Sequence, residues 1–267
     1  MKKLLVVVML MLSGVTWAGD FEDGEEALMK QNFPLALQKF KSAGLKGDAN
    51  AQYTVGLMYG NGISVKEDSA EAAKWLTLSA NQGYAKAQNI LGGCYTDGNG
   101  VKQDLAQALR WYSAAAEQGE ADAQYSLGGM YSRGEGVVQD YAKAQKWIRL
   151  AAEKGVSDAQ YNLGGIFLFG ERGFLKDYRE AVKWFKLAAA QGNVNAQYML
   201  GTMYQQGEGV PQNNPRAYMW LSLAAADGDI SAKKFMKVLE EEMTPAQLAQ
   251  SQKIARDCKA RSFKNCD

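Results

Sequence analysis

The sequence predicts an all-α fold, a solenoid of helical hairpins, from three observations. Near-copies of one segment, which is AQYSLGGMYSRGEGVVQD in its third occurrence, start at alanines spaced by 36, 36, 36 and 37 residues: Ala51, Ala87, Ala123, Ala159 and Ala196. One tryptophan per copy recurs at steps of 36, 36, 37 and 36: Trp75, Trp111, Trp147, Trp184 and Trp220. Each copy also alternates apolar residues at helical spacing with glycine-rich turns. A period of this length is typical of stacked helical hairpins.

Each copy predicts two helices. In the first, Ala51, Val55, Met58 and Tyr59 fall on one helical face. The second is predicted to begin after an N-cap aspartate, which is Asp68, Asp104, Asp140 or Asp177. Glu71 and Glu180 stand three residues after their caps and predict capping boxes. Each second helix is expected to end at a glycine: Gly83, Gly119, Gly155, Gly192 and Gly228.

A glycine also recurs in the middle of every first helix, at Gly56, Gly92, Gly128, Gly164 and Gly201. Glycine costs about 1 kcal/mol relative to alanine in a helix interior. Its recurrence therefore predicts a compensating contact, either the close approach of a neighbouring helix or a tryptophan ring.

The pattern AQYxLGxMYxxGxGVxxD…A…KWxxxAAxxG resembles the Sel-1-like repeat, a relative of the tetratricopeptide repeat. The resemblance covers the repeats 48–83, 84–119, 120–155, 156–192 and 193–228. Residues 19–47 resemble a degenerate N-terminal repeat, with Lys39 where the tryptophan stands elsewhere. Residues 229–267 are expected to form C-terminal capping helices and a disulfide tail, and Thr244 is predicted to cap the last helix. The family implies a right-handed α/α superhelix whose first helices line a concave, partner-binding face.

The first eighteen residues predict a secretory signal peptide. Lys2 and Lys3 precede a short apolar run, and Thr16, Trp17 and Ala18 form an acceptable cleavage site before Gly19. We therefore expect an exported protein, in a bacterial periplasm or secreted. Without residues 1–18 the chain has 28 basic and 29 acidic residues. This balance argues against nucleic acid as the main partner, and no later stretch predicts membrane insertion.

The residue types argue against most enzyme classes. The chain has no histidine, which excludes Ser-His and Cys-His nucleophile pairs and the usual zinc sites. No cofactor or metal site is expected. Cys258 and Cys266 are predicted to form a disulfide in an oxidising compartment, whereas Cys94 takes the position of an apolar residue and is expected to be buried.

One enzyme alternative comes from the family, because some secreted members bind or hydrolyse β-lactams. Ser231 and Lys234 form an SxxK sequence. No SDN or KTG sequence accompanies it, and the β-lactam-binding relatives carry a cysteine pair in each repeat, which this chain lacks. Ser231 moreover takes the position of Asp122 and Asp158, where a helix cap is expected.

The positions at which the copies differ indicate the partner surface. Two rows vary, three and ten residues after the repeated alanine, and the partner-binding candidates from them are Ser126, Asn162, Met199, Arg133, Phe169 and Gln206. In the segment IFLFGERGF, Leu168 and Phe169 replace small or polar residues next to Arg172. Exposed apolar side chains beside an arginine are typical of an interaction hot spot. The alternative is that this longer turn folds over its own apolar residues.

These observations predict a non-enzymatic scaffold or adaptor of the bacterial cell envelope that binds a peptide or protein on its concave face. Two alternatives remain: a β-lactam-binding or cell-wall-hydrolysing enzyme, and a secreted factor that binds a host protein.

Overall fold

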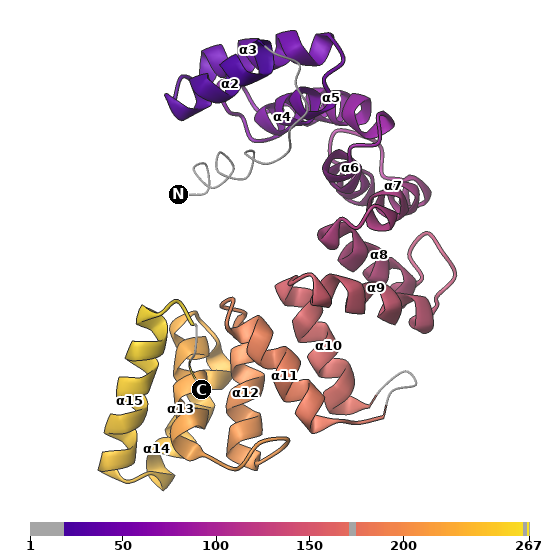
Figure 1. Ribbon diagram of the computed structural model, residues 1–267. Helices are drawn as coiled ribbons and strands as arrows, with labels where there is room; N and C mark the ends of the chain where they lie inside the picture. The colour runs from indigo at the N-terminus through magenta and orange to yellow at the C-terminus, as the bar shows by residue number, and fades with distance from the viewer. Residues whose placement is uncertain (1–18, 171–174, 264–265, 267) are drawn as a thin grey trace. The chain divides into compact units, whose positions relative to one another are not determined.

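The computed structural model describes residues 19–170, 175–263 and 266. The regular elements in these ranges are all helices, so the fold is all-α, as predicted (Figure 1). The contacts divide the chain into two parts, here called the N-terminal unit (residues 1–139) and the C-terminal unit (residues 140–267). The predicted signal peptide, residues 1–18, lies outside the described residues. None of the described helices has the length and apolar character needed to span a membrane.

The N-terminal unit is a series of antiparallel hairpins in which each helix packs against the next. Its described helices are α2 (Asp20–Met29), α3 (Phe33–Leu45), α4 (Ala49–Gly60), α5 (Ser69–Asn81), α6 (Ala85–Asp97), α7 (Leu105–Glu117) and α8 (Ala121–Arg133).

The C-terminal unit continues the same pattern and ends differently. Its described helices are α9 (Tyr141–Glu153), α10 (Ser157–Phe169), α11 (Tyr178–Ala189), α12 (Val194–Gln206), α13 (Asn214–Ala226), α14 (Ile230–Glu242) and α15 (Pro245–Ala260). Helix α13 packs against both α14 and α15, so α15 covers the end of the repeats (Figure 1). Thr244 caps α15, as predicted, and forms a capping box with Gln247, while Pro245 stands at the first position of the helix.

The predicted caps of the second helices are confirmed, but the capping boxes are not. The side chains of Asp68, Asp104, Asp140 and Asp177 accept hydrogen bonds from backbone N–H groups of the first turn. The backbone N–H of Asp68 donates to the carbonyl of Tyr59 at 3.0 Å, so it is already satisfied. Glu71 instead accepts from the indole Nε1 of Trp75 at 3.0 Å. At Asp177 the backbone N–H likewise donates to the carbonyl of Phe167, but Glu180 accepts from Lys183 Nζ at 3.2 Å and not from Trp184.

The mid-helix glycines allow close approach between the two helices of a hairpin. A Cβ atom on Gly56 would lie 2.8 Å from Leu76, on Gly92 2.8 Å from Tyr112, and on Gly164 2.7 Å from Phe185. The contacting residue is in each case the one that follows the tryptophan, so the predicted close approach is confirmed but the tryptophan ring does not provide it. In the N-terminal hairpin, Gly24 faces the buried ring of Phe40 in the same way.

The glycine-rich turns form contacts between neighbouring repeats. Gly100, in the turn after α6, has φ +75° and lies directly against the carbonyl of Ser69, the first residue of α5. Gly209 contacts the carbonyl of Tyr178, the first residue of α11, in the same way. These turns therefore carry packing between neighbouring repeats.

Buried glutamines join each hairpin to the previous one. Gln52 and Gln88 follow the repeated alanine, and their amides donate to the carbonyls of Gly44 and Ala80 at 2.9 and 3.1 Å. The Oε1 atoms of these two glutamines accept from Gln82 and Gln118 respectively, both at 2.7 Å. In the C-terminal unit the pair Gln160 and Gln191 repeats this arrangement at 2.8 Å. We call these contacts the glutamine ladder.

The ladder lacks a rung at two glutamines, Gln124 and Gln197, whose buried Oε1 atoms have no hydrogen-bond partner among the described residues. The second of these, in the last complete repeat, leads to a stability prediction. Gln197 is fully buried and its Oε1 has no donor, because Asp227 stands where Gln82 and Gln118 stand in their repeats. We expect Asp227→Gln to raise the free energy of unfolding by about 1 kcal/mol through the added hydrogen bond. It also removes a negative charge from the C-terminal end of α13. Urea denaturation measures the gain, and Asp227→Asn is the control, since it removes the charge with a shorter side chain. An equal gain in both variants would contradict the prediction, because the gain would then come from the lost charge and not from the added hydrogen bond.

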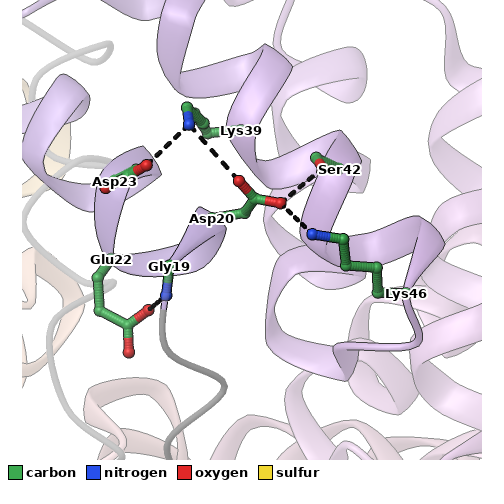
Figure 2. A network of polar contacts seen from close by, with 7 residues as sticks. All are labelled: Gly19, Asp20, Glu22, Asp23, Lys39, Ser42 and Lys46. Atoms are coloured by element: carbon green, nitrogen blue, oxygen red, sulfur yellow. Dashed lines mark hydrogen bonds and ion pairs between the residues drawn. The ribbon is translucent and has the colours of Figure 1, made fainter.

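The start of α2 is fixed by an ion-pair network on α3 (Figure 2). Asp20 accepts hydrogen bonds from Ser42 Oγ at 2.6 Å and Lys46 Nζ at 2.5 Å, and Lys39 Nζ lies 3.5 Å from its other oxygen. The hydrogen bonds from Lys46 and Ser42 lower the pKa of Asp20 to about 2. Asp20 is therefore ionised at any ordinary pH, and the network stays intact.

Candidate partner-binding groove

A groove opens on one face of the C-terminal unit. Its volume is about 360 Å³, and its lining comes from α10, α11, α12, α14 and the turns beside them: Leu168, Phe169, Lys176, Tyr178, Tyr198, Met199, Thr202, Met203, Gln206, Glu208 and Phe235. Three of the four helices that contribute to it, α10, α12 and α14, are first helices of their hairpins. The groove thus lies on the surface that the sequence assigned to a partner.

The repeat register explains why these residues meet. Met199 and Phe235 both stand three residues after the repeated alanine position, on α12 and α14, while Phe169 and Gln206 both stand ten residues after it, on α10 and α12. Along α12, positions 199, 202, 203 and 206 are spaced i, i+3, i+4, i+7, which places them on one helical face. Residues of both variable rows therefore meet in this groove.

The walls are aromatic and thioether side chains. The rings of Tyr198 and Phe235 meet edge to face with centroids 5.9 Å apart. Burial and the charge of Asp229 raise the pKa of Tyr198. The side chain of Phe169 is 59% exposed although it is one of the largest apolar residues in the unit. Aromatic and methionine side chains are the types enriched at protein interfaces.

Two charged side chains of opposite sign line the groove. Lys176 is exposed, and its Nζ donates to the hydroxyl of Tyr178 at 3.2 Å while lying 5.1 Å from the centroid of that ring. Glu208 stands in the turn after α12. Neither charge has an ion-pair partner among the described residues.

Three of the candidate partner-binding residues line the groove: Phe169, Met199 and Gln206. Leu168 also lines it, but the prediction that Leu168 is exposed is wrong, since only 7% of its surface is accessible. It follows Gly164 by four residues and so lies on the face of α10 that packs against α11.

The remaining predicted residues do not line the groove. Asn162 is half-buried on α10, and Ser126 is half-buried on α8. Arg133, at the end of α8, forms a two-fold hydrogen-bonded ion pair with Glu135 at 2.6 and 2.7 Å, which raises the pKa of Arg133 and lowers that of Glu135. Arg172 lies outside the described residues.

The sequence also left some groove residues unnoticed. Phe235 could have been found, because continuing the row of Asn162 and Met199 by one more repeat leads to it. Tyr178 and Lys176 belong to no variable row, and only the fold brings them to the groove.

The other chemical candidates occupy different places. Ser231 and Lys234 are both exposed on α14, and no hydrogen bond joins them. The N-cap of α14 is Asp229, so Ser231, like Asp122 and Asp158, lies inside its helix and the expected cap role is wrong. Cys94 is partly buried against the core, and burial raises the pKa of its thiol, which disfavours a reactive thiolate. Within the described residues no cluster of His, Cys, Asp and Glu is arranged to hold a metal ion.

At the C-terminal end, the Sγ atoms of Cys258 and Cys266 lie at disulfide-bonding distance. Both side chains are buried in the core of the C-terminal unit. Nearby, the ring of Phe263 packs beside Gly192, so the tail after α15 is held against the turn between α11 and α12.

Comparison with known proteins places these features in a family. The model of the Sel1 repeat matches residues 49–84, 85–120, 121–156, 157–193 and 194–229, which is more than half of the chain. The chain belongs to the Sel1 repeat family. Among the curated proteins, none matches it significantly.

Solved structures of Sel1 repeat proteins resemble this one. A Sel1 repeat protein from Oxalobacter formigenes is 35% identical, with a TM-score of 0.76 over 82% of this chain and 64% of its own. A protective antigen of uropathogenic Escherichia coli with an SLR fold is 30% identical, with a TM-score of 0.49 over 91% of this chain and 61% of its own. This chain thus spans less than two thirds of either relative. Sel1 repeat proteins generally mediate protein–protein interactions, on a scaffold that is typically non-enzymatic.

Proposed function

We propose that this Sel1 repeat protein is an adaptor of the bacterial cell envelope that binds a segment of a partner protein in the groove of its C-terminal unit. The observation that carries the proposal is the exposure of Phe169, at 59%, on the rim of a groove whose walls are also aromatic. A large apolar side chain left accessible beside a preformed groove is typical of a binding surface.

The shape of the groove favours a peptide segment over a small metabolite. The groove has aromatic walls and two methionines, and its polar groups include one lysine and one glutamate. Apolar side chains of a partner would displace water from these walls and gain about 25 cal/mol per Å² buried. Flexible methionines can adapt their shape to such side chains.

The location of the adaptor is part of the proposal. Its support is the apolar, lysine-headed segment 1–18 and the two cysteines at bonding distance, which suit an exported, oxidising compartment. Fractionation of the native cells tests it: we expect the mature chain, starting at Gly19, in the periplasmic or culture fraction. Cytoplasmic protein that retains residues 1–18 would contradict this part.

The partner site is tested with a photoreactive residue at position 169 in the native cells. The control places the same residue at Lys146, an exposed position of α9 that does not line the groove. We expect a discrete adduct from position 169 and none from position 146.

Substitution tests the same site on the captured partner. Phe169→Asp should weaken partner binding at least about tenfold, because it removes an apolar anchor and introduces a charge. The melting temperature should change little, since Phe169 is mostly exposed. Leu187→Asp is the matched control: Leu187 is 44% exposed on α11 and does not line the groove. Equal losses from both variants, or none from Phe169→Asp, would reject the groove as the partner site.

A further inference from the structure

The charges of the chain are divided unevenly between the two units. Residues 19–139 contain 10 lysines and arginines against 15 aspartates and glutamates, whereas residues 140–267 contain 18 against 14. The N-terminal unit thus has a formal charge of −5 and the C-terminal unit, which holds the groove, has +4. A field of this sign attracts acidic partners and raises their association rate.

On one side of the groove, Lys176 carries a positive charge, the same sign as the net charge of the C-terminal unit. Lys176 donates one hydrogen bond to the Tyr178 hydroxyl at 3.2 Å. An ammonium group has three donors, and two of them have no acceptor among the described residues. No acidic side chain lies within ion-pair distance of Lys176 among the described residues. A carboxylate of a bound peptide would supply the missing partner.

Glu208, together with Lys176, gives the groove two opposite charges that can orient a charged ligand. It comes from the turn after α12, whereas Lys176 comes from the turn before α11. A ligand carboxylate is attracted by Lys176 and repelled by Glu208, so only one orientation of an acidic segment suits both charges. The aromatic and methionine walls meanwhile require a large apolar side chain beside that carboxylate.

From these observations we infer that the groove selects an acidic peptide segment, in which a large apolar or aromatic side chain enters between Phe169, Met199 and Phe235 and a neighbouring Asp or Glu binds Lys176. The inference rests on the proposed function and names the chemistry of its partner. A second copy of the chain, through its acidic N-terminal unit, is the competing occupant.

Selection from a displayed library of random peptides tests the inference, with the full mature chain and its Lys176→Glu variant as baits. The wild-type chain should enrich peptides that carry an aromatic or large aliphatic residue close to Asp or Glu. The variant should lose the acidic preference or replace it with Lys and Arg. Affinities of the enriched acidic peptides, measured by fluorescence anisotropy, should fall about tenfold in Lys176→Glu and weaken with added salt.

Lys253→Glu is the matched control. Lys253 is exposed on α15 of the same unit and does not line the groove. Both substitutions change the net charge equally, so a loss confined to Lys176→Glu identifies a direct contact. We expect Lys253→Glu to change affinity by less than about twofold.

The outcomes separate the inference from the proposed function. If peptides are enriched that depend on Phe169 but show no acidic preference, the groove binds apolar segments and the inference is wrong. If no peptide is enriched, both are contradicted. Self-association of the wild-type chain that Lys176→Glu abolishes, detected by analytical ultracentrifugation, would replace the peptide with a second copy as the occupant.

Discussion

Gly100→Ala is expected to destabilise the N-terminal unit by about 3 kcal/mol or more. A Cβ atom at this position would overlap the carbonyl oxygen of Ser69, which belongs to the backbone and cannot rotate away. Relieving that overlap requires separating two neighbouring repeats, an overpacking effect of about 1–3 kcal/mol. The positive φ of Gly100, +75°, adds about 1–2 kcal/mol for any residue with a Cβ atom.

Gly98→Ala is the control for this prediction. Gly98 belongs to the same turn and has φ +72°, but a Cβ there would come no closer than 3.4 Å to Gln103. It should therefore lose only the conformational part, about 1–2 kcal/mol. Urea denaturation of both variants, followed by circular dichroism, measures the difference. Equal destabilisation would mean that the turn does not carry the contact between repeats.

The second large effect concerns two adjacent glycines of α10, at which we expect alanine to change the free energy of unfolding in opposite directions. Gly164→Ala would place a Cβ 2.7 Å from the ring of Phe185, which is fully buried on α11. We expect a net loss of about 1–2 kcal/mol, because overpacking exceeds the gain in helix propensity. At Gly165 nothing lies within 4 Å of the added Cβ. Gly165→Ala should therefore stabilise the protein by about 1 kcal/mol.

Thermal unfolding of the two variants side by side checks this pair. Both have the same composition and differ only in which face of α10 gains a methyl group. Stabilisation by both alanines would show that α10 and α11 can separate without loss, and destabilisation by both would show that the face at Gly165 is covered.

Comparison of the repeats with one another already distinguishes these glycines in the sequence. The position of Gly164 is glycine in every copy, whereas that of Gly165 is leucine at Leu57 and threonine at Thr202. The repeat therefore predicts that packing requires glycine at the position of Gly164 and tolerates a side chain at the position of Gly165. The caps at Asp68 and Asp177 were equally predictable, because a cap depends only on residues of the same helix turn.

Predictions that depended on distant partners were less successful. The capping box at Glu71 was wrong because the carbonyl of Tyr59 already binds the N–H of Asp68. The exposure of Leu168 was misjudged because variability between copies does not show which face of a helix a residue occupies. Of the candidate site, the rows containing Phe169 and Met199 were visible in the sequence. The turn residues that complete the groove, such as Lys176, depend on how the hairpins stack.

The contacts between hairpins have a consequence for how such a chain can change its length. The junctions described above are made by residues of two adjacent repeats, as with Gly100 on Ser69 and Gln88 on Ala80. A tandem duplication of one 36-residue period, the step from Ala51 to Ala87, would therefore supply both halves of every new junction at once. Recombination can lengthen or shorten this protein by whole periods while leaving the terminal helices, and the groove formed by the last hairpins, unaltered.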